Sequence, residues 1–264
     1  MNNKKNIILI TGASSCMGAE FSKYYSYSED NIVFTLSRKN IDVCKNTQHV
    51  MIDLLNNNQI QKKILPILVS LKDTLVWHVC IVHWAWKVKN ELLWVTPIVD
   101  INNDGIDDEM YDAQICTFDN LYMCVSDFFK QQHMYDQTKF TLVGMWSLID
   151  KFNSPIHKSM REINTIMRDK LRSIAEEESN HHIVMLSLST VATETEKKYR
   201  QFADQSYWLS GNDVVDKSIS TINNRKNVYE DLPIYKYHPL YESYFKNETI
   251  DQRIERFKKE IGLI

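Results

Sequence analysis

The sequence predicts a fold of the α/β class, in which a mostly parallel β-sheet is covered by helices on both faces. Short apolar runs alternate with longer amphipathic stretches, and this alternation is typical of βαβ units. With 264 residues, 44% of them apolar and 25% charged, the chain can bury a large core without disulfides. No Gly/Ser-rich or Pro-rich linker divides it, so a single domain is expected.

Hydrophobic spacing predicts each element in turn. Runs of four to eight residues rich in Ile, Val and Leu indicate buried strands, and apolar residues three and four apart indicate helices. The stretch 156–178 is the clearest helix, because its apolar residues form one stripe. The segment after 196 is less regular and rich in tyrosine, so it predicts a lobe of loops and helices. The expected strands are 7–10, 32–36, 49–52, 75–82, 140–145 and 183–188, and the expected helices are 19–27, 58–71, 108–132, 156–178 and 250–261.

Charge and cysteine content exclude several classes of function. The net charge of -3 does not favour a nucleic-acid partner. Two histidines interrupt the longest apolar tract, 74–86, so neither a membrane span nor a membrane partner is expected. The five cysteines form no CxxC pair, which predicts a reducing compartment: the cytoplasm, with the nucleus as the alternative. Because His78 and Cys80 fall on one face of a strand and His83 on the other, no metal site is expected.

Glycine is scarce, and its placement carries information. The chain has 6 glycines, whereas average usage would give roughly 18. The first turn after a strand reads Thr-Gly-Ala-Ser-Ser-Cys-Met-Gly-Ala-Glu over 11–20. This turn resembles that of the short-chain dehydrogenase/reductase family, Thr-Gly-x-x-x-Gly-x-Gly, in which backbone N–H groups at a helix N-terminus hold a pyrophosphate. We expect Gly12, Ser14, Cys16 and Gly18 to form the cofactor loop, with a turn that binds no ligand as the alternative. Because Cys16 replaces the middle glycine, its side chain should weaken binding.

The resemblance implies a doubly wound, Rossmann-type sheet and NADP as the cofactor. In family members that prefer NADP, a basic residue after the second strand pairs with the 2′-phosphate, and Arg38 stands there. Asp53 ends the third strand, where the family places an aspartate beside the adenine. The alternatives are a surface arginine and a helix-capping aspartate. The resemblance further implies a nucleotide-binding core at 1–195 and a substrate lobe at 196–264.

The resemblance also implies a catalytic serine, tyrosine and lysine, of which the tyrosine is missing. Ser147 fits the serine and Lys158 the lysine, but Ser154 occupies the place of the tyrosine. An aliphatic hydroxyl has a pKa far above the value of about 10 for a phenol, so it is a poor substitute. Gln114 replaces an asparagine that helps to hold a proton-relay water. The Tyr-x-x-x-Lys sequence at 135–139 precedes the fifth strand, and we interpret it as a solvated turn.

Two further family motifs are altered. After the fourth strand the family has Asn-Ala-Gly, and we align His78 with the Asn and Cys80 with the Gly. After the sixth strand it has Pro-Gly and a threonine that contacts the nicotinamide. Here Leu188-Ser189 replaces the pair, and Thr193 is retained.

These substitutions predict a degenerate reductase-fold protein, a pseudoenzyme that acts by binding and whose NADP binding is weak or absent. The alternative is a residual NADP-dependent carbonyl reductase with a small carbonyl substrate. A third reading is binding of another nucleotide in the altered loop. The segment Ala175-Glu176-Glu177-Glu178 is most similar to fungal sepiapterin reductase-like or benzil reductase-like members. Family members commonly pair through their long helices, which implies a homodimer through 108–132 and 156–178.

Overall fold

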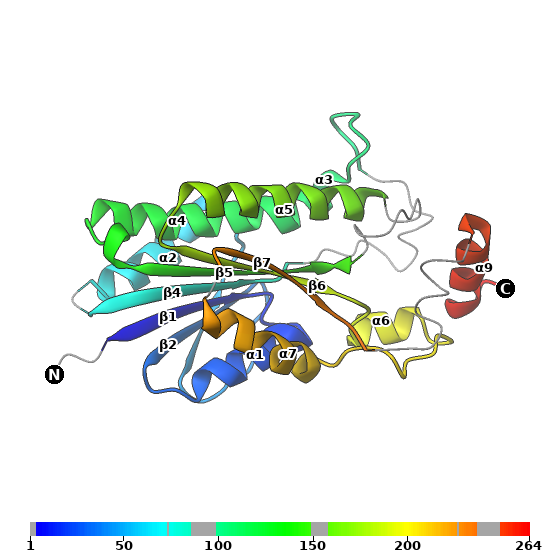
Figure 1. Cartoon of the computed structure of the whole chain (residues 1–264), viewed down its shortest axis with the longest axis horizontal. Helices are drawn as coiled ribbons and strands as arrows, with labels where there is room; N and C mark the ends of the chain where they lie inside the picture. The colour runs from blue at the N-terminus through cyan, green and yellow to red at the C-terminus, as the bar shows by residue number, and fades with distance from the viewer. Residues whose placement is uncertain (1–3, 73, 86–98, 149–157, 226, 237–248) are drawn as a thin grey trace.

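In the part of the chain that the structure describes, the strands form one parallel sheet of seven strands (Figure 1). The structure, a computed structural model, describes residues 4–72, 74–85, 99–148, 158–225, 227–236 and 249–264. The strand order is β3-β2-β1-β4-β5-β6-β7, and every described pairing is parallel. This confirms the predicted α/β class. The strands are β1 (Lys5–Thr11), β2 (Asn31–Ser37), β3 (Thr47–Met51), β4 (Val76–His83), β5 (Lys139–Ser147), β6 (His181–Leu188) and β7 (Tyr229–Ile234).

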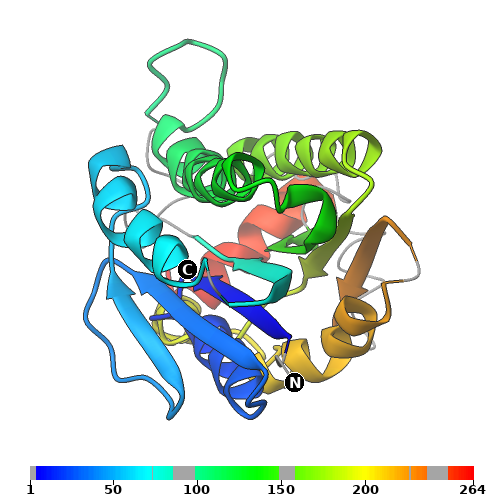
Figure 2. The same cartoon turned by 90° about the vertical axis from the view of Figure 1, so that its left-hand side faces the viewer.

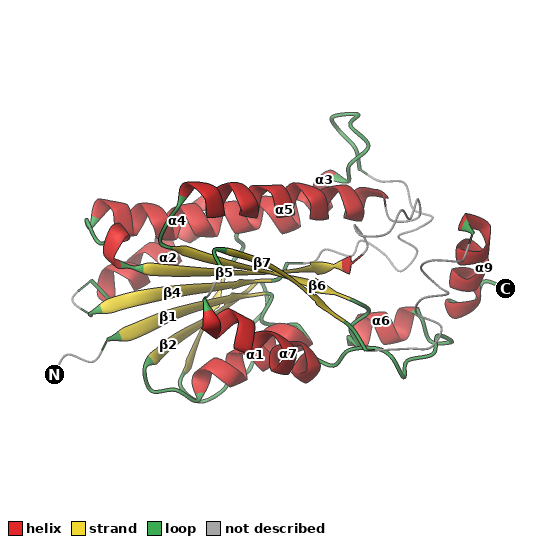
Figure 3. Cartoon of the chain, viewed as in Figure 1, coloured by secondary structure: helices red, strands yellow, loops and turns green. Residues whose placement is uncertain are grey.

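Helices cover both faces of the sheet (Figure 2). One face packs against α2, α4 and α5, and the other against α1 and α7 (Figure 3). The helices are α1 (Cys16–Ser26), α2 (Asn57–Ser70), α3 (Asp108–Tyr111), α4 (Thr117–Gln131), α5 (Lys158–Glu177), α6 (Glu194–Tyr199), α7 (Gly211–Asn224) and α9 (Ile250–Glu260).

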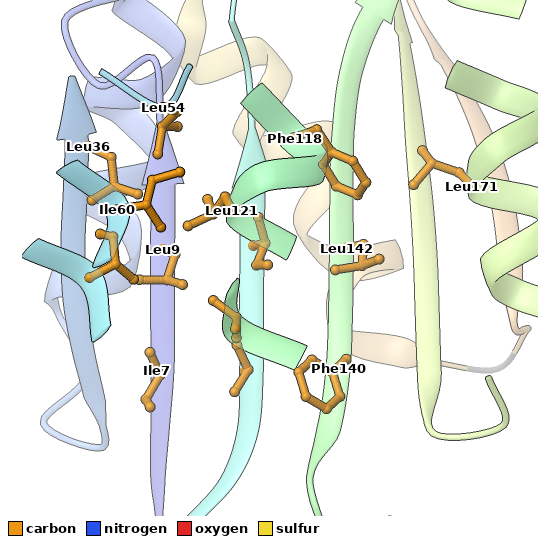
Figure 4. Close-up of a cluster of buried hydrophobic side chains, with 14 of the residues drawn as sticks. Ile7, Leu9, Leu36, Leu54, Ile60, Phe118, Leu121, Phe140, Leu142 and Leu171 are labelled. Atoms are coloured by element: carbon orange, nitrogen blue, oxygen red, sulfur yellow. The ribbon is translucent and has the colours of Figure 1, made fainter. Parts of the chain in front are cut away.

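Burial on both faces explains why the central strands are continuously apolar. In β1, Ile7 and Leu9 face the cluster formed with α2, α4 and α5 (Figure 4), and Ile8 and Ile10 face the cluster formed with α1 and α7. Successive side chains of a strand point to opposite faces of the sheet, so a strand with both faces buried has apolar residues at every position. Four consecutive apolar residues are therefore the sequence signal of this strand.

Two features differ from the sequence-based expectation. The expected helix over 108–132 is divided into α3, a π-helical turn (Asp112–Cys116) and α4. The strand β7 falls in the segment expected to form loops and helices, whereas α7 in the same segment agrees with that expectation. The strand β7 reads Tyr-Glu-Asp-Leu-Pro-Ile, and its proline and charges are rare in interior strands but tolerated at an edge. It pairs with β6 at the edge of the sheet.

The lobe beyond the carboxyl ends of the strands contains α6 and the C-terminal α9 (Figure 1). Arg200, which follows α6, donates through Nε and Nη2 to the Glu260 carboxylate of α9 at 2.9 and 2.8 Å. Both side chains are buried, and Arg200 also pairs with Glu196 at 3.0 Å. This network fixes the predicted C-terminal helix against the rest of the lobe. Within the described part of the chain, no helix has the length and apolarity needed to span a membrane.

Candidate functional site

The strand order reverses between β1 and β4: β2 and β3 were added on one side of β1, and β4 to β7 on the other. The turn after β1 lies at this switch point, which is a common ligand site in open α/β sheets. Gly12 has φ +61°, and a Cβ added there would lie 2.0 Å from the Trp84 carbonyl oxygen. A Cβ on Gly18 would lie 2.6 Å from the Gly12 carbonyl oxygen. Ser15 caps α1, because its hydroxyl accepts a hydrogen bond from the Gly18 N–H at 3.2 Å. Both glycines therefore permit close packing of the turn, α1 and the end of β4.

The other two loop residues differ in exposure. Ser14 is exposed, whereas Cys16 is the half-buried first residue of α1. A Cβ on Gly211 of α7 would lie 2.9 Å from the Cys16 carbonyl oxygen, so the two helices approach closely here. Burial raises the pKa of the Cys16 thiol above its usual range, and the thiol is therefore protonated at neutral pH.

Arg38 and Asp53 follow the two strands beside the turn. The pairings Thr11 with Leu36 and Ser37 with Met51 align the carboxyl ends of β1, β2 and β3. Arg38 is exposed and makes no ion pair with the residues that the structure describes. The Asp53 carboxylate accepts the Leu55 N–H at 3.1 Å, which leaves its other oxygen available. The turn, one cation and one carboxylate thus share one edge of the sheet.

His83 is a site residue that the sequence reasoning missed. Its Nε2 donates to the Gln114 carbonyl at 3.1 Å, and its Nδ1 accepts from the Thr11 hydroxyl at 3.0 Å. A carbonyl oxygen only accepts, so this pair of bonds selects the Nε2–H tautomer. Burial lowers the pKa of His83 to about 4, and the ring is therefore neutral. The available signal was its position at the end of an apolar run directly before Trp84.

Gln114 lies in the π-helical turn, an element found frequently at functional sites. It is 1% exposed, and neither atom of its side-chain amide has a hydrogen-bond partner among the described residues. Its backbone carbonyl accepts the His83 bond. The residue expected to help hold a water is thus bonded through its carbonyl to a neighbouring side chain.

The remaining catalytic candidates have structural contacts of their own. Ser147 ends β5, and its carbonyl accepts from Asn164 Nδ2 at 2.9 Å. Lys158 begins α5 and is exposed; a Cβ on Gly105, in the loop before α3, would lie 2.6 Å from its Nζ. The Thr193 hydroxyl caps α6 by accepting the Glu196 N–H at 3.0 Å. Ser154 lies outside the described residues.

The expectation that His78 and Cys80 face the cofactor is wrong. His78 pairs with Asn6, six residues before Gly12 in β1, and at about 3.3 Å per residue this places His78 roughly 20 Å from the turn. Cys80 is fully buried within β4, beneath Tyr25. The error arose because the motif was aligned with the start of β4, which continues to His83.

The Tyr-x-x-x-Lys sequence at 135–139 was expected to form a solvated turn, and the structure differs at its tyrosine. It precedes β5, as expected, but Tyr135 is buried and packs against the Phe140 ring at 5.1 Å. Tyr135 is therefore a core residue, whereas Asp136, Gln137 and Lys139 of the same turn are exposed, as expected.

No protein-family model matches this sequence, and no curated protein is similar to it in sequence. Solved structures are similar in fold. A 4-hydroxyisoleucine dehydrogenase complexed with NADH is 17% identical, with a TM-score of 0.61, over 87% of this chain and 96% of that chain. A short-chain dehydrogenase from Burkholderia cenocepacia in complex with NADP is 12% identical, with a TM-score of 0.64, over 98% and 94%. Actinorhodin polyketide ketoreductase with NADPH is 11% identical, with a TM-score of 0.64, over 88% and 96%.

The sheet order and the turn at its switch point define a Rossmann-type α/β protein. More particularly, the chain has the fold of the short-chain dehydrogenase/reductases, which confirms the fold that the resemblance implied.

Proposed function

We propose that this protein is a degenerate short-chain dehydrogenase/reductase that transfers no hydride and acts by binding. The observation that carries the proposal is the absence of a tyrosine between Ser147 and Lys158 in the sequence. General acid-base catalysis needs a group whose pKa approaches the working pH. A serine hydroxyl does not meet this requirement, and the lysine that would assist it lies beside Gly105.

The adenosine side of a nicotinamide dinucleotide fits the described residues better than the nicotinamide side. The Gly12 turn, the exposed Arg38 and the partly free Asp53 carboxylate would hold the pyrophosphate, the 2′-phosphate and the adenine. Arg38 favours NADP over NAD, because a guanidinium pairs with a phosphate dianion. The structural neighbours named above carry NADH, NADP or NADPH, which supports this class of ligand. Such a cofactor, when bound, supplies a hydride.

The positions beside a nicotinamide support binding without turnover. The Gln114 carbonyl is bonded to His83, and the Thr193 hydroxyl caps α6. At the loop itself, Cys16 adds a side chain where close backbone approach is needed. Weak or absent cofactor binding is the consequence we propose.

Titration of the purified protein with NADPH and NADH, followed by thermal shift, tests the proposal. We expect at most weak binding, a preference for NADPH that Arg38→Ala removes, and no oxidation of NADPH in the presence of benzil. Turnover of benzil that Lys158→Ala abolishes would overturn the proposal in favour of the carbonyl reductase. Lys139→Ala is the matched control, because it removes an exposed lysine at the opposite edge of the sheet. A wider nucleotide panel in the same assay covers binding of another nucleotide.

We also infer a cytoplasmic location and a homodimer. The location is inferred from the five cysteines of the sequence, which form no CxxC pair and leave one without a partner for a disulfide. The dimer would form through α4 and α5, which lie side by side and are linked by the Lys170–Asp119 ion pair at 2.7 Å.

A further inference from the structure

A pocket of about 430 Å³ opens at the amino ends of the parallel strands. The Gly12 turn lies at the opposite, carboxyl ends of the same strands. The pocket lies between the beginnings of β1 and β4, the end of α1 and the end of α7. Its volume is within the range of small-molecule sites. None of the functional roles considered above uses this pocket. Its main lining residues are Asn6, Tyr24, Tyr25, Trp77, His78 and Arg225.

A chain of hydrogen bonds holds the polar wall of this pocket in place. Asn6 Nδ2 donates to Asn31 Oδ1 at 2.8 Å, and Asn6 Oδ1 accepts from His78 Nδ1 at 3.3 Å. His78 Nε2 then accepts from the Thr141 hydroxyl at 2.9 Å. Burial lowers the pKa of His78 to about 3, and the nearby Arg225, His182 and Lys139 side chains contribute to the lowering. His78 is therefore neutral, and this wall carries no charge.

Arg225 supplies the one charge of the pocket lining. Its Nε is buried, and the guanidinium has no hydrogen bond or ion pair with any residue that the structure describes. The side chain as a whole is half-buried, and a cation that loses part of its hydration without gaining a partner is unfavourable. Its backbone is left-handed, with φ 44° and ψ 35°, a conformation that is uncommon for arginine. An unpaired cation on a strained backbone suggests a role in binding.

Aromatic rings complete the pocket. The Arg225 guanidinium lies 5.4 Å from the centroid of the Trp77 ring. Trp77 is an extra residue of β4, because Lys5 pairs with Val76 and Asn6 pairs with His78. Tyr24 and Tyr27 stand at the rim and are 36% and 77% exposed. Rings at this spacing offer flat apolar surfaces beside a fixed cation.

We propose that this pocket binds a small organic monoanion: a carboxylate carried on a flat apolar ring. The guanidinium pairs with the carboxylate through two parallel hydrogen bonds, and the ring stacks among Trp77 and the tyrosines. A carboxylate fits better than a phosphate dianion, because Arg225 is the one cation among the lining residues and His78 is neutral. The site is independent of cofactor binding, since the length of β1 separates it from the Gly12 turn.

Titration with benzoate, benzamide and inorganic phosphate, followed by calorimetry and ligand-observed NMR, tests the proposal. Benzamide is the neutral isostere of benzoate. We expect saturable benzoate binding that is roughly tenfold or more tighter than benzamide binding, as the loss of a charged hydrogen bond implies. We expect Arg225→Gly to weaken benzoate binding by a similar factor. Glycine adopts this backbone conformation readily, so the variant should fold.

Arg172→Gln is the matched control, because Arg172 also lies 5.4 Å from a ring, that of Tyr229, but lines no part of the pocket. It should leave benzoate binding unchanged. Trp77→Leu removes one of the aromatic rings that line the pocket and should also weaken benzoate binding. The proposal is overturned by an absence of saturable benzoate binding, by equal affinity for benzoate and benzamide, or by undiminished binding in Arg225→Gly. Phosphate that binds more tightly than benzoate would overturn the carboxylate assignment.

Discussion

Lowering the pH from 7 to 5 is expected to destabilise this protein, because three buried histidines resist protonation. Burial lowers the pKa of His78 to about 3 and those of His83 and His181 to about 4. In the unfolded chain each imidazole has a pKa near about 6.5. Below that pH the unfolded chain takes up protons that the folded protein does not. The free energy of unfolding therefore falls as the pH falls, and it levels off near the folded pKa values.

For His83 the difference of about 2.5 pKa units corresponds to about 3.4 kcal/mol once the pH is below both values. About 2 kcal/mol of this loss is expected between pH 7 and pH 5. Three such histidines together lose about 6 kcal/mol over the same interval. That is a large fraction of the usual stability of a domain, about 5–15 kcal/mol.

Urea denaturation followed by circular dichroism at pH 7, 6 and 5 measures this loss. In His83→Gln the loss between pH 7 and 5 should be smaller by about 2 kcal/mol, because the variant has one titrating group fewer. Glutamine can still donate to the Gln114 carbonyl. In the control His133→Gln, which changes an exposed histidine, the loss should match that of the parent protein. An equal loss in His83→Gln and the parent would refute the reasoning.

Three other substitutions test separate contacts. Glu260→Gln leaves the buried Arg200 with a weaker set of partners and should destabilise the protein by about 3 kcal/mol in a thermal melt. The control Glu255→Gln, in an exposed pair on the same helix, should change stability little; equal effects would contradict the role of burial. Gly12→Ala should cost about 1–3 kcal/mol in urea denaturation, since the residue has φ +61° and its Cβ would meet the Trp84 carbonyl; unchanged stability would exclude this geometry. If the chain dimerises through α4 and α5, Met123→Glu should produce monomers in sedimentation, because Met123 is 57% exposed on α4; a monomeric parent protein would remove the dimer proposal.

The hydrophobic pattern predicted the central strands and long helices, because both faces of these strands are buried. It failed for β7, whose sequence Tyr-Glu-Asp-Leu-Pro-Ile has no strand periodicity. This edge strand is held partly by Asp231, which pairs with the buried Arg168 of α5 and accepts from the Ser187 hydroxyl. Such long-range polar pairing has no local signature in the sequence.

The candidate site was predictable where it depends on residue order next to a strand. The Gly12 turn, Arg38 and Asp53 follow three consecutive strands, and parallel pairing aligns the ends of those strands. The motif after β4 was misplaced, since an apolar run does not indicate its own last residue. The side-chain direction of Lys158 was also beyond the sequence, because contact with Gly105 depends on packing between α5 and the loop before α3.

The sequence by itself determined the α/β class, the first turn and the lack of a tyrosine between Ser147 and Lys158. These are local properties, set by hydrophobic period, glycine position and residue identity. Only the tertiary structure decided that His83 bonds to Gln114 and that Asn6, Trp77 and Arg225 line one pocket. Residues so far apart in the chain meet because parallel strands align their amino ends at one edge of the sheet, and the end of α7 packs beside that edge. The unpaired charge of Arg225 is therefore a property of the fold, and no local pattern in the sequence contains it.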